Sequence, residues 1–211
     1  MIILFDLDGT IIDSTDAILE CFHNSFDFYE FPHPSDDEIK ALIGYPLDVM
    51  YENLGVQNEK IWDFVGTYKE NYRKISTQKT YLLEFAREAI VLAKEFASLG
   101  IVTTKTGEYS QILMEHFELM NYFDVLIGRE HVIRPKPDGE PILKALEYFS
   151  PIDQEIWMIG DTKLDLICAK NAGVKSIGVL SGYDNHETLK KYTDVIFSDV
   201  YEAVKWLKSS K

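Results

Sequence analysis

The chain has 211 residues, enough for one substantial core and for one or two domains. Hydrophobic residues make up 46% of it and aromatic residues 13%, which is typical of a globular protein and excludes a disordered chain. The net charge of -14 argues against a nucleic-acid backbone or an anionic membrane surface as partner.

Other features of the sequence bear on where in the cell the protein is located. No run of about 18 apolar residues is present. Asp6 and Asp8 interrupt the N-terminal apolar stretch before a signal peptide could form. Cys21 and Cys168 stand far apart, with no second cysteine or histidine at metal-ligand spacing, so we expect buried thiols. We therefore expect a cytoplasmic protein.

The first predicted strand covers residues 1–5 and ends in Asp6, Asp8 and Gly9. A continuous apolar run suits a strand that is buried on both faces of a parallel sheet. Ligands of open α/β sheets bind beyond the carboxyl ends of the strands, so the two carboxylates stand where chemistry is expected. Taken alone, the same residues fit a solvated turn equally well.

Residues 14–80 are predicted to contain helices only. The helices are expected at residues 16–28, 35–44, 47–54 and 58–75. Ser35 and Glu38 have the spacing of a capping box at the start of the second helix. The last helix has apolar residues at helical spacing. They are Ile61, Trp62, Phe64, Val65, Tyr68 and Tyr72.

From about residue 83, strands alternate with helices. Helices are expected at residues 84–99, 109–119, 140–149, 164–171, 187–192 and 201–207, and strands at 101–104, 123–127, 155–160, 175–180 and 194–197. Gly100 is expected to end the first of these helices. The alternation predicts βαβ units in an α/β fold with a doubly wound (Rossmann-like) parallel sheet. The first strand must join that sheet, which predicts a core domain of residues 1–13 and 81–211 with an inserted all-helical domain, 14–80.

Polar clusters follow four of the predicted strands. They are Asp6 with Asp8, Thr103 with Thr104, Lys136, and Asp161 with Asp165. Because the carboxyl ends of parallel strands share one edge, these clusters can converge. Their residue types fit phosphoryl transfer: carboxylates hold Mg²⁺, a lysine neutralises charge, and an aspartate can act as nucleophile or general acid.

Single members of these clusters have simpler interpretations. Thr103 alone is more often an ordinary β-branched strand residue, and Asp165 alone suits the first turn of a helix. Lys136 alone fits a solvated loop, and Lys105 competes with it as the cation of the site. The prolines that flank Lys136 favour it, because they restrict its backbone. The histidines show no ligand spacing.

Four motifs resemble those of the haloacid dehalogenase-like hydrolases, in that family's order. Asp6-Leu7-Asp8-Gly9-Thr10 is similar to the first motif, DxDGT, and Gly160-Asp161-Thr162-Lys163-Leu164-Asp165 is similar to the fourth, GDxxxD. Thr103 and Lys136 take the places of the second and third motifs. The resemblance implies a Mg²⁺-dependent phosphatase that forms an aspartyl phosphate.

Catalytic roles follow from the resemblance. Asp6 would be the nucleophile and a metal ligand. Asp8 would be the general acid and base, with its backbone carbonyl on the metal. The presence of this second aspartate argues against the dehalogenase branch of the family.

Binding roles follow in the same way. Thr103 and the backbone amide of Thr104 would bind the phosphoryl group, and Lys136 would stabilise it together with the nucleophile. Asp161 would be a direct ligand of Mg²⁺, and Asp165 would support the metal site.

The substrate class is the least specific part of the resemblance. Helices inserted after the first motif are similar to the family's type 1 cap, and residues 43–47 with Asp13-Ser14 resemble phosphoglycolate phosphatase-like members. Gly139 departs from the family pattern, in which a second proline is common. The resemblance implies a small phosphorylated metabolite, with 2-phosphoglycolate as the leading substrate.

A phosphosugar mutase (β-phosphoglucomutase-like) is the alternative, and a non-catalytic binding protein is disfavoured because no catalytic carboxylate is missing. We expect a monomer or small homo-oligomer that binds neither nucleic acid nor membrane.

Overall fold

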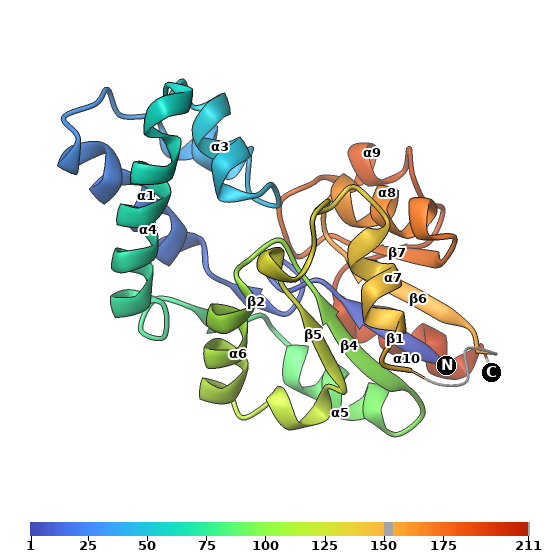
Figure 1. The fold of residues 1–211 in the computed structure, drawn as a ribbon. Coiled ribbons are helices and arrows are strands. Elements are labelled where there is room, and N and C mark those ends of the chain that lie inside the picture. The colour runs from blue at the N-terminus through green and yellow to red at the C-terminus, as the bar shows by residue number, and fades with distance from the viewer. Residues whose placement is uncertain (150–153, 211) are drawn as a thin grey trace. The chain divides into compact units, whose positions relative to one another are not determined.

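A computed structural model describes residues 1–149 and 154–210 of the chain (Figure 1). The chain divides into two compact units, Met1–Asp13 with Leu82–Lys211, and Ser14–Tyr81. We call the first the α/β unit and the second the helical unit. No helix of the described residues is long and apolar enough to cross a membrane.

The α/β unit is built on a six-stranded sheet in the order β5-β4-β1-β6-β7-β8, and all of its strand pairs are parallel. The strands are β1 (Ile2–Phe5), β4 (Ser98–Val102), β5 (Val125–Ile127), β6 (Ile156–Gly160), β7 (Lys175–Val179) and β8 (Ile196–Phe197). The chain adds β4 and β5 on one side of β1 and then crosses to add β6 on the other side. The switch point of the sheet therefore lies at β1, where ligands of such folds bind.

Both faces of the sheet are covered by helices, which confirms the predicted doubly wound α/β fold. Ile3 and Phe5 of β1 belong to one apolar cluster, which includes residues of α5, α6 and α10. Ile2 and Leu4 belong to a second cluster, which includes residues of α7 and α8. The helices are α5 (Ala86–Lys94), α6 (Gly107–His116), α7 (Glu140–Leu146), α8 (Lys163–Ala172), α9 (His186–Leu189) and α10 (Val200–Ser209), and the short 3-10 helices are η2 (Met120–Tyr122) and η3 (Arg129–His131).

The helix predicted over residues 84–99 is shorter than expected. α5 ends at Lys94 and β4 already begins at Ser98, so Gly100 lies inside a strand and the prediction that it ends a helix was wrong. A Cβ atom at Gly100 would lie 2.7 Å from Cδ2 of Leu4 and 2.9 Å from Cγ1 of Val125. Glycine at this position leaves room for side chains of the two neighbouring strands.

The helical unit contains α1 (Thr15–Phe28), α2 (Asp36–Lys40), α3 (Leu47–Asn53), η1 (Asn58–Lys60) and α4 (Ile61–Ile75). The predicted capping box is confirmed: the N–H of Ser35 donates to Glu38 Oε2 at 2.8 Å, and the N–H of Glu38 donates to Ser35 Oγ at 3.3 Å. These bonds satisfy N–H groups that a helix start leaves unpaired.

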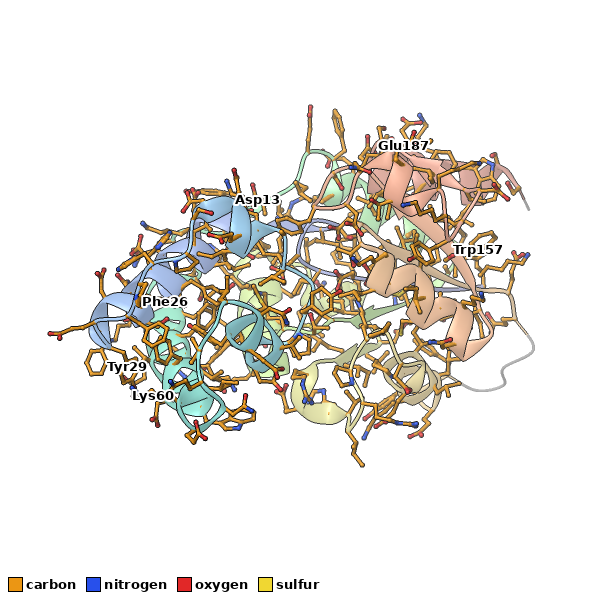
Figure 2. The ribbon with its side chains drawn as sticks, turned by 90° about the horizontal axis from the view of Figure 1, so that it is seen from above. Asp13, Phe26, Tyr29, Lys60, Trp157 and Glu187 are labelled. Carbon is orange, nitrogen blue, oxygen red and sulfur yellow. The ribbon has the colours of Figure 1, made fainter. Side chains whose placement is uncertain are left out.

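An aromatic cluster centred on Phe64 forms the core of the helical unit. The ring of Phe64 is fully buried and lies 4.5 Å from that of Tyr29 and 5.3 Å from that of Phe26 between centroids (both are labelled in Figure 2). Tyr51 adds a third contact at 5.4 Å. Trp62, predicted on the same apolar face, is instead 67% exposed.

A second sheet, which the sequence did not predict, pairs β2 (Ile12–Asp13) with β3 (Tyr81–Leu82). Next to it, the N–H of Leu83 donates to the carbonyl of Ile11 at 3.0 Å. The two segments of the α/β unit that flank the helical unit are therefore joined at this point.

Candidate active site

Four of the predicted site residues meet in a buried cluster. Nζ of Lys136 lies 2.8 Å from Oδ1 of Asp6 and 2.5 Å from Oδ1 of Asp165. Carboxylate oxygens of Asp6, Asp161 and Asp165 all lie within 4.8 Å of one another. None of the four residues is more than 6% exposed. The cluster joins the ends of β1 and β6, the start of α8 and the loop before α7.

Asp165 has two functions in this arrangement. Thr162 precedes α8, and its N–H and hydroxyl both donate to Oδ2 of Asp165, at 3.0 and 2.7 Å. This is the helix-start position that the simpler interpretation of Asp165 predicted. The other oxygen of the same carboxylate accepts the bond from Lys136, so the helix cap also holds the lysine.

Asp161 is held by groups to which the sequence analysis gave no role. The hydroxyl of Thr10 donates to Oδ1 at 2.9 Å, and the N–H of Tyr183 donates to Oδ2 at 2.9 Å. A Cβ atom added at Gly9 would lie 2.3 Å from Oδ2 of Asp161, and one added at Gly182 would lie 2.0 Å from the same oxygen. Both glycines therefore make room for the carboxylate. The loop that contains Gly182 and Tyr183 follows β7. Its position after the carboxyl end of a predicted strand is the sequence feature from which a contact with the site could have been predicted.

The loop before α7 is tied down around Lys136. The N–H of Ile133 donates to Glu140 Oε1 at 2.8 Å, and the side-chain amide of Asn171 donates to the carbonyl of Pro137 at 2.9 Å. A Cβ atom at Gly139 would lie 2.8 Å from the backbone nitrogen of Ala172. The close approach of this loop to α8 gives a physical reason for glycine there in place of the family's second proline.

Burial and the charges of neighbouring carboxylates together set the electrostatics of the cluster. Burial and the neighbouring Asp165 raise the pKa of Asp6 to about 7, although Lys136 opposes this shift. Burial and Asp165 also raise the pKa of Asp161 well above its ordinary value. Burial disfavours the charge of Lys136, but the carboxylates of Asp165 and Asp6 outweigh it and raise the pKa of this lysine.

These residues fit a Mg²⁺ ion. Hard carboxylate oxygens are its preferred protein ligands, and three carboxylates are gathered here, two of which contact the ammonium group of Lys136. A divalent cation would balance the remaining negative charge. Asp6 and Asp161 would hold it, and Asp165 would support the site.

Asp8, Thr103 and Thr104 lie at the same edge of the sheet. Oδ1 of Asp8 is 3.1 Å from Nζ of Lys105, the lysine that competed with Lys136 in the sequence analysis. Thr103 directly follows β4 and is 4% exposed; its N–H donates to the carbonyl of Ile127 at 2.9 Å. Thr104 is half-buried. The two lysines thus contact different aspartates.

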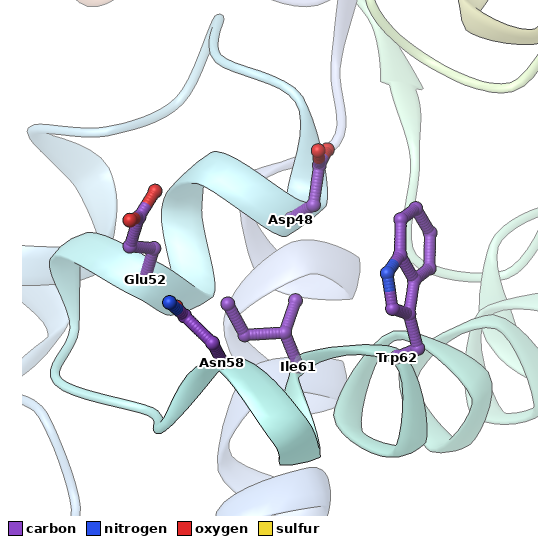
Figure 3. A pocket seen from close by; sticks show the side chains of 5 residues that line it. All are labelled: Asp48, Glu52, Asn58, Ile61 and Trp62. Atoms are coloured by element: carbon purple, nitrogen blue, oxygen red, sulfur yellow. The ribbon is translucent and has the colours of Figure 1, made fainter.

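A separate hollow of about 220 Å³ lies within the helical unit, between α3 and α4 (Figure 3). It is lined by Asp48, Glu52, Asn58, Ile61 and Trp62. Its two carboxylates repel an anionic ligand. We therefore place no phosphate chemistry in this hollow.

Known proteins resemble the chain over nearly its whole length. The model of the haloacid dehalogenase-like hydrolase family matches residues 3–179. Pyrophosphatase PpaX of Bacillus velezensis is 31% identical over 208 residues, which cover 92% of this chain and 94% of that protein. A protein of Dickeya dadantii with the name Probable phosphatase IndB is 30% identical over 209 residues, 96% of this chain and 91% of its own. The structure of a haloacid dehalogenase-like family hydrolase from Streptococcus pneumoniae has a TM-score of 0.87 at 25% identity, covering 98% of this chain and 97% of its own.

Proposed function

The chain belongs to the haloacid dehalogenase-like hydrolase family, and from this membership we propose that it is a phosphatase that works through a phosphorylated Asp6. The observation that carries the proposal is the contact of Lys136 with both Asp6 and Asp165, beside Asp161. Residues from separate stretches of the chain supply the nucleophile, the cation and the metal carboxylates of one reaction.

The reaction has two steps. In the first, a carboxylate oxygen of Asp6 attacks the phosphorus atom, and the bond from phosphorus to the leaving oxygen breaks while Asp8 donates a proton to that oxygen. In the second, Asp8 takes a proton from a water molecule that attacks the aspartyl phosphate. The bond between phosphorus and Asp6 then breaks, and phosphate leaves. Lys136 orients the Asp6 carboxylate throughout and offsets the charge of the phosphoryl group.

The remaining predicted residues bind rather than react. The hydroxyl of Thr103 and the backbone amide of Thr104 would donate to phosphoryl oxygens beyond the end of β4. Asp6, Asp161 and the backbone carbonyl of Asp8 would hold Mg²⁺. The bound ion would withdraw charge from the phosphoryl group. Hydrogen-bond donors and a cation aimed at the phosphoryl oxygens stabilise the negative charge that these oxygens carry in the transition state.

For the substrate we propose a small phosphorylated metabolite, with 2-phosphoglycolate first. The support is the resemblance of residues 43–47 and Asp13-Ser14 to phosphoglycolate phosphatase-like proteins. Pyrophosphate is the second candidate, because a relative that is 31% identical over most of both chains carries the name pyrophosphatase. Both substrates would present one phosphoryl group to Asp6 with an anionic leaving group.

A phosphate-release panel with Mg²⁺ tests the proposal. We expect hydrolysis of 2-phosphoglycolate or pyrophosphate, and loss of at least about 1,000-fold in kcat for Asp6→Asn, because the nucleophile is removed. Asp63→Asn, at an exposed position of α4, is the control and should retain activity. Full activity of Asp6→Asn, or activity in excess chelator, contradicts the mechanism. Conversion of a sugar phosphate without phosphate release would instead identify a mutase.

A further inference from the structure

A second lysine, Lys105, lies beside the acid/base residue in a position that the mechanism above does not use. Its side chain is 8% exposed, and its Nζ lies 3.1 Å from Oδ1 of Asp8, whose side chain is 13% exposed. Lys136 contacts Asp6 and Asp165 instead. The nucleophile and the acid/base residue therefore each have a lysine of their own.

The backbone of Lys105 is held from two sides. Its N–H donates to Thr103 Oγ1 at 3.2 Å, and its carbonyl accepts from the N–H of Arg129 at 2.9 Å. A Cβ atom at Gly128 would lie 2.9 Å from the Lys105 carbonyl oxygen and 2.3 Å from the backbone nitrogen of Gly107. The segments after β4 and β5 thus pack backbone against backbone, and this contact fixes the place from which the lysine side chain extends.

Stability alone does not account for a lysine at this position. A buried ion pair loses in desolvation about as much as it gains in attraction. Binding accounts for it better, because a lysine is a compact cation with donors that turn toward an anion. Asp8 must reach the leaving oxygen of the substrate, so an ammonium group 3.1 Å from Asp8 stands beside the first atoms of the leaving group.

We propose that Lys105 is a specificity-determining residue that binds a negative group on the leaving side of the substrate. The inference rests on the proposed function, since it takes Asp8 as the group that protonates the leaving oxygen. 2-Phosphoglycolate carries a carboxylate one carbon away from its bridging oxygen, and pyrophosphate carries its second phosphoryl group directly on that oxygen. Both offer Lys105 an anion, whereas an alkyl ester offers it none.

The test compares 2-phosphoglycolate with ethyl phosphate, in which a methyl group replaces the carboxylate, and uses pyrophosphate as a second anionic substrate. In Lys105→Gln we expect kcat/KM for the anionic substrates to fall by about 10-fold to 100-fold, mainly through KM, because a charge-assisted hydrogen bond is lost. Any loss that arises through the contact of Lys105 with Asp8 is shared by ethyl phosphate, so the ratio of the kcat/KM values for the anionic substrates and ethyl phosphate measures the preference, and this ratio should fall. Lys105→Arg should recover most of the preference, and Lys170→Gln, at an exposed position of α8, should change neither value.

A binding measurement completes the test. Calorimetric titration of the same compounds into Asp6→Asn, with and without Lys105→Gln, measures the preference where turnover is blocked. An equal loss for charged and uncharged esters, or an unchanged preference, overturns the assignment of Lys105. If the wild-type protein with Mg²⁺ hydrolyses no phosphate compound, the proposed function fails instead, and the titrations still decide the assignment of Lys105.

Discussion

The buried carboxylates of the site work against the stability of the metal-free protein. Asp6, Asp161 and Asp165 bring their oxygens within 4.8 Å of one another, and Lys136 is the cation that contacts two of them. Unbalanced buried charge is costly, and part of that cost is met when a carboxyl group keeps its proton. The raised pKa values of Asp6 and Asp161 express this cost, so the same residues that suit Mg²⁺ make the protein sensitive to its removal.

The pKa of Asp6 gives this sensitivity a pH dependence. In the folded protein it is raised to about 7, from an ordinary value of 3.8. Between these values the folded state keeps a proton that the unfolded state has lost, so the contribution of Asp6 to the free energy of unfolding falls as pH rises. Mg²⁺ competes with this proton. We expect the rise in Tm on adding Mg²⁺ to be larger at pH 8 than at pH 6.

Thermal unfolding of metal-stripped protein, with and without added Mg²⁺, measures this difference. Asp6→Asn has no carboxyl proton to displace at this position, so its Mg²⁺ response should be smaller and should differ less between the two pH values than that of the wild-type protein. Asp63→Asn should behave like the wild-type protein. A wild-type Mg²⁺ response that is equal at both pH values would contradict the prediction.

At the scale of helices and strands, the sequence predicted most accurately where the signal is local. The apolar run before Asp6 and the capping box at Ser35 depend on neighbouring residues, and both were predicted from them. Gly100 was misread because its reason is a contact with β1 and β5, segments far away in the sequence. The contacts of Thr10 and Tyr183 with Asp161 were missed for the same reason.

Two neighbouring residues of α4 show how far periodicity alone can be trusted. Trp62 and Phe64 both fitted the apolar pattern, yet Trp62 is 67% exposed and Phe64 is fully buried. Phe64→Ala removes the centre of the aromatic cluster, so we expect it to lower the free energy of unfolding by about 3–5 kcal/mol. Trp62→Ala should change it by about 0.5 kcal/mol or less, because an exposed ring loses few contacts. Urea unfolding followed by circular dichroism measures both, and similar losses for the two variants would contradict the burial of Phe64.

At the scale of the whole molecule, the predicted site residues lie in one unit, and the inserted helices form the other. All of the predicted site residues lie in the α/β unit, whose two apolar clusters are formed by its own residues. The segments that flank the helical unit are joined by the bond from Leu83 to Ile11. A short linker can therefore close the chain at this point without stretching the sheet. We predict that the helical unit selects the leaving group, as a cap would, and removal of this unit tests the prediction.

We expect a chain in which a short Gly-Ser linker replaces residues 14–81 to fold and to keep Mg²⁺-dependent hydrolysis of p-nitrophenyl phosphate, since the reacting residues are all retained. Its preference for 2-phosphoglycolate over a larger sugar phosphate should fall by about 10-fold to 200-fold, because shape selection by pocket contacts is worth about that much. Phosphate release from each compound, together with circular dichroism of the shortened chain, measures both effects.

The same shortened chain separates two sources of selectivity. Lys105 lies in the α/β unit, so the preference for 2-phosphoglycolate over ethyl phosphate should survive removal of the helical unit and disappear only when Lys105→Gln is added. Selection by size and selection by charge would then come from different units of the chain. If the shortened chain folds and hydrolyses p-nitrophenyl phosphate but still rejects the sugar phosphate, the helical unit does not select the leaving group. If it also loses the preference for the charged ester while Lys105 is intact, residues of the helical unit contribute to recognition of the anion.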